Sequence, residues 1–147
     1  MKTGITGTAS ATIDAPVSKV WEALTQPEII KQYFFNTDTH TSWKVGSPIR
    51  FTGEWEGKTY EDKGTVLAFE PNKRLSYTYW SSMSGAEDLP ENYVTVTYQL
   101  SEENGKTKVE ISQDNIPDEN TKEHSEGNWN KVLGNLKQLL EQKELTI

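Results

Sequence analysis

The sequence contains no cysteine, and histidine occurs only twice in its 147 residues. The lack of cysteine excludes disulfide bridges, thiolate nucleophiles and cysteine-ligated metal sites, and it fits the reducing cytoplasm. No stretch approaches the run of about 20 apolar residues that a membrane-spanning helix needs. Residues 1–7 lack the apolar core of a signal peptide. We therefore expect a soluble, unexported protein located in the cytoplasm.

Positive charge is also scarce. The chain has 15 Lys and Arg residues against 22 Asp and Glu residues, which gives a formal net charge of −7 at pH 7. Because no basic cluster reverses this sign locally, we expect no nucleic-acid partner and no membrane partner. Apolar residues make up 33% of the chain and aromatic residues 10%, so a few large rings must supply much of the buried surface. The length predicts a single domain over residues 1–147.

The common catalytic and metal-binding motifs are missing as well. The sequence has no Gly-x-Ser-x-Gly nucleophile turn, no Gly-rich phosphate loop followed by Lys-Ser/Thr, and no His-x-x-x-His pair. His40 and His124 lie among polar residues, which indicates solvated imidazoles. We predict no cofactor, no metal site and no catalytic residue. Of the two interpretations, enzyme or non-enzyme, we favour a protein that is not an enzyme.

Four carboxylates surround one expected hairpin, and strand alternation favours a solvated interpretation for them: Glu54, Glu56, Glu61 and Asp62. A carboxylate buried beside aromatic rings would instead be the leading candidate for a general base. An enzyme that uses such a group stays open as an alternative.

Hydrophobic periodicity predicts an α+β fold. Residues 5–13 alternate with period two, as a half-buried strand does. Asp14 is expected to cap a helix that has Pro16 in its first turn, and Pro27 is expected to begin a second short helix. Strand-like segments then follow up to Ile111, and Gly64 is interpreted as the mark of a bulge.

The last predicted element is an amphipathic helix that begins near Trp129. Its apolar residues recur at i, i+3, i+4 and i+7 and form one stripe: Trp129, Val132, Leu133, Leu136, Leu139 and Leu140. One face of this helix must therefore meet the sheet. The expected order is a strand, two short helices, about six strands and a final helix.

Four segments together resemble one known family. They are Ile13-Asp14-Ala15-Pro16 with Val20-Trp21, Val45-Gly46-x-Pro48-Ile49-x-Phe51, Gly64-x-Val66 with Glu70-Pro71-x-x-Arg74-Leu75-x-Tyr77, and Trp129-x-x-x-Leu133-x-x-Leu136. The chain is similar over nearly its whole length to the family named for homologues of the activator of the heat-shock-protein-ninety ATPase. This family belongs to the START and birch-pollen-allergen-like superfamily. The resemblance implies a helix-grip fold, in which a curved antiparallel sheet of about six to seven strands wraps around a long C-terminal helix and leaves a cavity between them.

This expected cavity predicts the function. We expect a small hydrophobic or amphipathic ligand to bind between the sheet and the final helix, with no assigned reaction. The alternative is that the same side chains only fill the core, since an aromatic stripe is often packing. The predicted ligand-binding residues lie on the inward faces of the strands and on the helix stripe: Phe51, Trp55, Tyr77, Tyr79, Val96, Tyr98, Trp129, Leu133 and Leu136.

Protein binding is a further alternative, because the family takes its name from a domain that stimulates a chaperone ATPase. The resemblance thus implies a link to the stress response and a chaperone or other protein as a partner. The separate N-terminal module of the eukaryotic cochaperones is not found in these 147 residues, which makes direct activation of a chaperone the less favoured interpretation. An exposed apolar patch would favour it, and the expected places are Tyr33-Phe34-Phe35 and the loop from Ser81 to Glu91.

Overall fold

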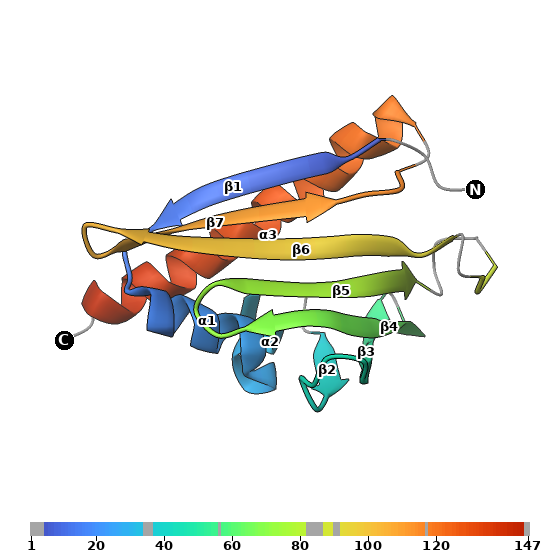
Figure 1. Ribbon diagram of the computed structural model, residues 1–147, viewed down its shortest axis with the longest axis horizontal. Coiled ribbons are helices and arrows are strands. Elements are labelled where there is room, and N and C mark those ends of the chain that lie inside the picture. The colour runs from blue at the N-terminus through green and yellow to red at the C-terminus, as the bar shows by residue number, and fades with distance from the viewer. Residues whose placement is uncertain are drawn as a thin grey trace.

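The computed structural model describes residues 5–33, 37–55, 57–81, 87–89, 92–116 and 118–145, and the side chains of residues 55, 58, 81 and 142–145 lie outside this description. Its elements follow the predicted order of a strand, two helices, six strands and a helix (Figure 1). In chain order they are β1 (Gly7–Ile13), α1 (Val17–Thr25), α2 (Pro27–Tyr33), β2 (Asp38–Thr41), β3 (Pro48–Trp55), β4 (Lys58–Glu70), β5 (Arg74–Ser81), β6 (Val94–Glu103), β7 (Lys106–Gln113) and α3 (Glu119–Leu145).

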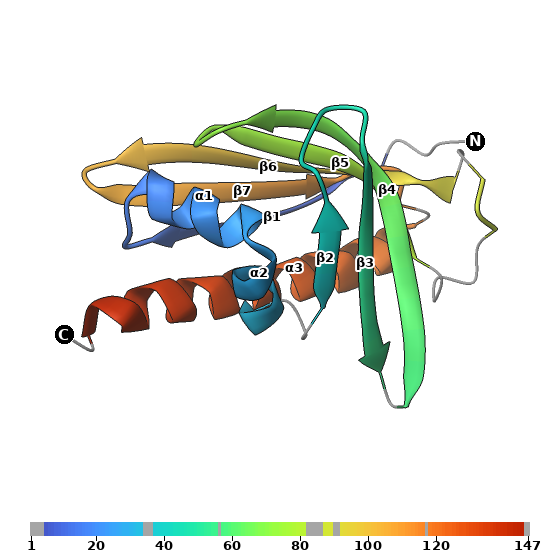
Figure 2. The same cartoon turned by 90° about the horizontal axis from the view of Figure 1, so that it is seen from below.

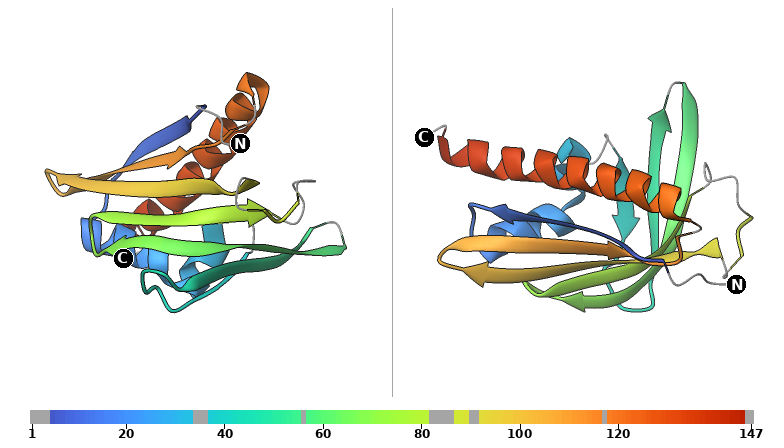
Figure 3. Two further views of the ribbon diagram at one scale, coloured as in Figure 1. Left: turned by 45° about the vertical axis from the view of Figure 1, so that its right-hand side comes forward. Right: turned by 90° about the horizontal axis from the view of Figure 1, so that it is seen from above.

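The strands form one antiparallel sheet of 7 strands in the order β1-β7-β6-β5-β4-β3-β2. The long helix α3 lies along one face of this sheet, and α1 and α2 cover the same face (Figure 2). At the other end of the sheet, β3 and β4 curve toward the side of the helix (Figure 3). The predicted helix-grip fold is therefore confirmed, and its concave face holds the core.

Strand alternation places the expected side chains in this core. Ile49 and Phe51 of β3 are buried while Arg50 between them is exposed. Leu75 and Tyr77 of β5 are buried as well, although Ser76 between them is also buried. The hairpin between β6 and β7 turns at Asn104 and Gly105, whose φ angles are 54° and 79°. Two successive positive φ angles match the twist of the flanking strands, so the predicted tight turn is confirmed.

The final helix begins at Glu119, earlier than the predicted start near Trp129. Its first turns are polar and include Gly127, so they carry no apolar stripe that periodicity could detect. The Asp118 carboxylate accepts a hydrogen bond from the Thr121 N–H at 2.7 Å and satisfies one of the free donors there. The stripe itself is confirmed, since Val132, Leu133 and Leu136 are fully buried.

The predicted cap of the first helix is wrong. Pro16 is the N-cap residue of α1, and it forms no side-chain cap hydrogen bond. The carboxylate of Glu102, at the end of β6, instead accepts a hydrogen bond from the Val17 N–H at 3.0 Å. Asp14 uses its own N–H to donate to Glu141 of α3 at 3.0 Å. A carboxylate that is 85 residues away in the sequence thus replaces the expected local cap.

The bulge in β4 also lies elsewhere than predicted. The pairing of β4 with β5 shifts register between Val66 and Ala68, not at Gly64. Gly64 serves a different purpose, because a Cβ atom at this position would lie 1.6 Å from the Thr78 carbonyl oxygen. Only glycine therefore allows β4 and β5 to approach this closely where the sheet bends.

Candidate functional site

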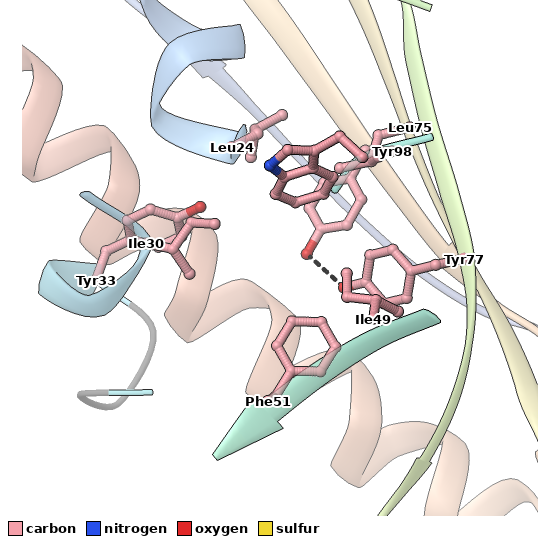
Figure 4. Close-up of a pocket in the computed structure, with 9 residues that line it drawn as sticks. Leu24, Ile30, Tyr33, Ile49, Phe51, Leu75, Tyr77 and Tyr98 are labelled. Carbon is pink, nitrogen blue, oxygen red and sulfur yellow. Dashed lines mark hydrogen bonds between the residues drawn. The ribbon is translucent and has the colours of Figure 1, made fainter. Parts of the chain in front are cut away.

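A small cavity lies between the sheet and the helices α1 and α2. Its volume is about 20 Å³, which is room for about one water molecule. The wall is almost entirely apolar and aromatic (Figure 4), and it consists of Leu24, Ile30, Tyr33, Trp43, Ile49, Phe51, Leu75, Tyr77 and Tyr98. The wall therefore shares its apolar and aromatic composition with small-molecule sites, but the space that it encloses admits nothing larger than water.

Tyrosine hydroxyls supply the polar groups of this wall. The hydroxyls of Tyr77 and Tyr98 form a hydrogen bond with an O–O distance of 3.3 Å (Figure 4), and the Tyr33 hydroxyl donates to the Ala23 carbonyl oxygen at 2.9 Å. Burial raises the pKa of Tyr98 to about 12, and it raises the pKa of Tyr33 and of Tyr77 well above the ordinary tyrosine value. All three rings are therefore neutral at physiological pH and can orient a ligand through hydrogen bonds.

Three of the predicted ligand-binding residues line this cavity: Phe51, Tyr77 and Tyr98. Their rings also touch one another, with centroids 5.5 Å apart for Phe51 and Tyr77 and 6.2 Å apart for Tyr77 and Tyr98. Tyr79 lies beside Phe51 at 5.8 Å. The side chain of Trp55 lies outside the described residues.

The other predicted residues pack beside the cavity, outside its lining. The ring of Trp129 meets Tyr98 edge to face, with centroids 6.0 Å apart, and its Nε1–H donates to Gln113 at 2.8 Å. Val96, Leu133 and Leu136 are buried in the core cluster. Because these side chains fill the space over β6, the open space lies toward α1 and α2, not directly under α3.

Sequence reasoning missed several wall residues for identifiable reasons. Ile49 and Leu75 share strand faces with Phe51 and Tyr77, but strand alternation alone does not indicate which residues of such a face border the cavity. Leu24 and Ile30 belong to helices whose docking on the sheet no local pattern specifies. Trp43 has a φ angle of 63°, a left-handed conformation that is uncommon for a large side chain and that its sequence context does not predict.

One of the four carboxylates around the hairpin is buried, which corrects the solvated interpretation of Asp62. Only 7% of Asp62 is exposed, whereas Glu54 and Glu61 are exposed as expected and Glu56 lies outside the described residues. Asp62 pairs with Phe51 across β3 and β4 and therefore shares the inward face of that ring. Its Oδ2 atom accepts a hydrogen bond from the Tyr79 hydroxyl. The reason for the error is that period two fixes which residues share a face but not which face is inward.

The histidines are exposed, as predicted. His40 forms a hydrogen bond to Thr52 at 3.0 Å on the outer face of the sheet, and His124 lies on the exposed side of α3. Within the described residues, no three His, Cys, Asp or Glu side chains gather in a way that could hold a metal ion. None of the described helices is long and apolar enough to cross a membrane.

The two places expected for an apolar patch are only partly described. Tyr33 is buried, while Phe34 and Phe35 lie outside the described residues. In the loop from 81 to 91, Leu89 is 40% exposed and Met83 lies outside the description. Leu89 is thus the exposed large apolar side chain among the described residues of this loop, and a single exposed leucine is common on protein surfaces.

A curved sheet that grips a long C-terminal helix, with an apolar cavity on its concave side, defines a protein of the helix-grip class. The family model described as Activator of Hsp90 ATPase homolog 1-like protein matches residues 14–141. The chain belongs to this family, which confirms the resemblance seen in the sequence. No protein among the curated ones matches the chain.

Solved structures agree with this assignment. The solution structure of ChR145 from Cytophaga hutchinsonii is 46% identical to the chain in sequence. The match covers 99% of this chain and 100% of ChR145, with a TM-score of 0.86. A crystal structure of a Mesorhizobium loti protein is 29% identical, with 94% and 98% of the two chains covered and a TM-score of 0.73. The solution structure of the Aha1 dimer from Colwellia psychrerythraea is 24% identical, with 93% and 96% covered and a TM-score of 0.74, and this likeness shows the fold alone.

Proposed function

We propose that this protein binds a small apolar or amphipathic molecule between its sheet and the helices α1 and α2. The observation that supports this most directly is the composition of the cavity, a wall of aromatic and aliphatic side chains with a few tyrosine hydroxyls. Such a combination is typical of small-molecule sites, where apolar surface supplies affinity and a few polar groups supply orientation. Membership of the family fits either ligand binding or protein binding. We assign no reaction.

A ligand larger than water requires one wall to move. Sites for drug-sized ligands have volumes of about 300 Å³ or more, whereas this cavity has about 20 Å³. Among the walls of the cavity, the short helix α2 is the one whose displacement exposes the least apolar surface to water. It has only two buried residues, Ile30 and Tyr33. Exposing two such side chains costs about 3–6 kcal/mol.

The free energy of ligand burial can offset that cost. A ligand that buries about 300 Å² of apolar surface gains about 7.5 kcal/mol at 25 cal/mol per Å². This is of the same order as the cost of displacing α2, and association itself costs about 4 kcal/mol or more, so tight binding requires a ligand that buries more than about 300 Å² or adds hydrogen bonds. We therefore expect binding to separate α2 from β3 and β5 while α3 stays packed on β1.

Nile red, an apolar dye that fluoresces in apolar surroundings, tests this proposal. We expect saturable fluorescence with the wild-type protein and a rise in melting temperature, since a ligand that binds only the folded state stabilises it. Ile30→Phe fills the cavity and is expected to weaken binding at least tenfold. Ile29→Phe is the matched control, because the adjacent Ile29 packs against the core but does not line the cavity.

Two results would contradict the proposal. The first is no saturable Nile red signal together with native mass spectra of freshly purified protein that show the bare chain alone. The second is an equal loss of binding in Ile30→Phe and Ile29→Phe, which would place the dye elsewhere.

A further inference from the structure

Two polar atoms on the inner face of the sheet have no hydrogen-bond partner within the described part of the chain. They are Oγ1 of Thr39 and Oδ1 of Asp62. Both residues are more than nine-tenths buried, with exposed fractions of 5% and 7%. Such atoms are rare in folded proteins, because a buried acceptor or donor without a partner destabilises the fold. Their presence on the concave face therefore calls for an explanation.

The strand register places these two residues on either side of one cavity residue. Phe51 of β3 pairs with Thr39 of β2 and with Asp62 of β4, so the three side chains form a row across the sheet on one face. Neighbouring strands lie about 4.8 Å apart. The two unpartnered atoms thus flank the Phe51 ring, which itself lines the cavity. Neither residue lines the closed cavity itself, and each lies one strand beyond its Phe51 wall.

Asp62 is the stronger acceptor of the two. Its Oδ2 atom already accepts the Tyr79 hydroxyl, whereas Oδ1 remains available. The basic residues next to Asp62 and Phe51 in the sequence form ion pairs with other carboxylates on the outer face of the sheet. Lys63 pairs with Asp88 at 2.5 Å, and Arg50 pairs with Glu61. The carboxylate therefore has hydrogen-bonding capacity that no described basic side chain uses.

We propose that Asp62 receives the protonated amine of an amphipathic ligand whose apolar part occupies the cavity. This inference rests on the proposed function and specifies the chemical class of the ligand. An ammonium group supplies the donor that Oδ1 needs, and charge-assisted hydrogen bonds of this kind are the stronger ones. The rings of Phe51 and Tyr79, 5.8 Å apart beside the carboxylate, favour a cation further, because aromatic faces attract positive charge. The net charge of −7 attracts cationic ligands and repels anionic ones.

Displacement of Nile red by two matched probes tests the inference. Phenethylamine and phenethyl alcohol share one apolar body and differ in carrying an ammonium or a neutral hydroxyl group. We expect the wild-type protein to bind the amine at least tenfold more tightly, which corresponds to about 1.4 kcal/mol. In Asp62→Asn the two affinities should become equal. Glu61→Gln is the matched control, since it removes the same charge from an exposed neighbouring residue and should keep the preference.

The outcomes separate the inference from the proposed function. Equal affinities of the two probes for the wild-type protein would overturn the inference while Nile red binding still stands. A preference that is the same in Asp62→Asn as in the wild type would overturn the role of Asp62. If Asp62→Asn does not fold, Tyr79→Phe provides the second test. That variant removes a hydroxyl that competes for the carboxylate, so the preference for the amine should rise, and a fall would contradict the inference.

Discussion

The close approach of β4 and β5 at Gly64 is the feature of this fold that a single methyl group should disturb most. In Gly64→Ala the added Cβ would lie 1.6 Å from the Thr78 carbonyl oxygen and 2.4 Å from its carbonyl carbon. An ordinary contact begins near 3.4 Å, so the strands would have to separate by roughly 1.8 Å. That separation also breaks the hydrogen bond of 2.9 Å from the Thr65 N–H to Thr78 Oγ1.

Three contributions determine how far Gly64→Ala changes the free energy of unfolding. Overpacking of this kind costs about 1–3 kcal/mol, and each lost hydrogen bond costs about 1 kcal/mol. Alanine also lowers the conformational entropy of the unfolded chain relative to glycine, and this offsets about 0.4–1 kcal/mol of the lost stability. We therefore expect Gly64→Ala to lower the free energy of unfolding by about 1–4 kcal/mol, or the melting temperature by roughly 3–15 °C.

Urea unfolding followed by circular dichroism measures this difference. Gly134→Ala is the matched control, because Gly134 lies in α3 and, apart from its chain neighbours and the backbone of its own helix, no described atom lies within 4 Å of the added Cβ. The control should raise stability by about 0.5–1 kcal/mol, the usual advantage of alanine over glycine inside a helix. If Gly64→Ala unfolds within about 0.5 kcal/mol of the wild type at an unchanged m value, the close approach of the strands is refuted.

Two further predictions concern pH and helix capping. Since burial raises the pKa of Tyr98 to about 12 from 10.0, the unfolded state loses this proton first as the pH rises. Stability should therefore hold up to about pH 10 and then fall by about 1.4 kcal/mol per pH unit for this tyrosine until about pH 12, and flat urea midpoints up to about pH 11 would contradict its burial. Glu102→Ala removes the acceptor for the Val17 N–H and should cost about 0.5–2 kcal/mol in thermal unfolding. Glu103→Ala, at the exposed next position, should change little, and equal losses in both variants would disprove the cap.

The parts of the fold that depend on local patterns could be predicted from the sequence. Alternation in residues 49–51 and 94–100 specifies strands because period two is a property of the backbone itself, and Asn104-Gly105 specifies its own turn. The stripe around Leu133 specifies the helix face that is buried. The start of α3 could not be found in this way, since its first turns are polar on every side.

The candidate site depends on contacts between distant segments, and for this reason it could be predicted only in part. Phe51, Tyr77 and Tyr98 were expected in the wall, because their strands alternate clearly between apolar and polar residues and the apolar face is the one to be buried. The burial of Asp62 was not, since a carboxylate beside Glu61 looks the same in a sequence whichever of the two faces inward. The unshifted pairing of Asp62 with Phe51 across β3 and β4 fixes that orientation, and such a cross-strand pairing is a tertiary feature.

The interior of this sheet is more polar than packing alone requires. An unpartnered buried polar atom costs about 1–3 kcal/mol, so Thr39 and Asp62 together cost about 2–6 kcal/mol. That is a large part of the about 5–15 kcal/mol by which a typical domain is stable. Apolar side chains of similar shape would fill the same positions without this cost. Thr39 and Asp62 therefore lower the stability of the fold beside an apolar cavity. A ligand with hydrogen-bond donors would restore that stability. Such a local loss of stability is expected of a binding site.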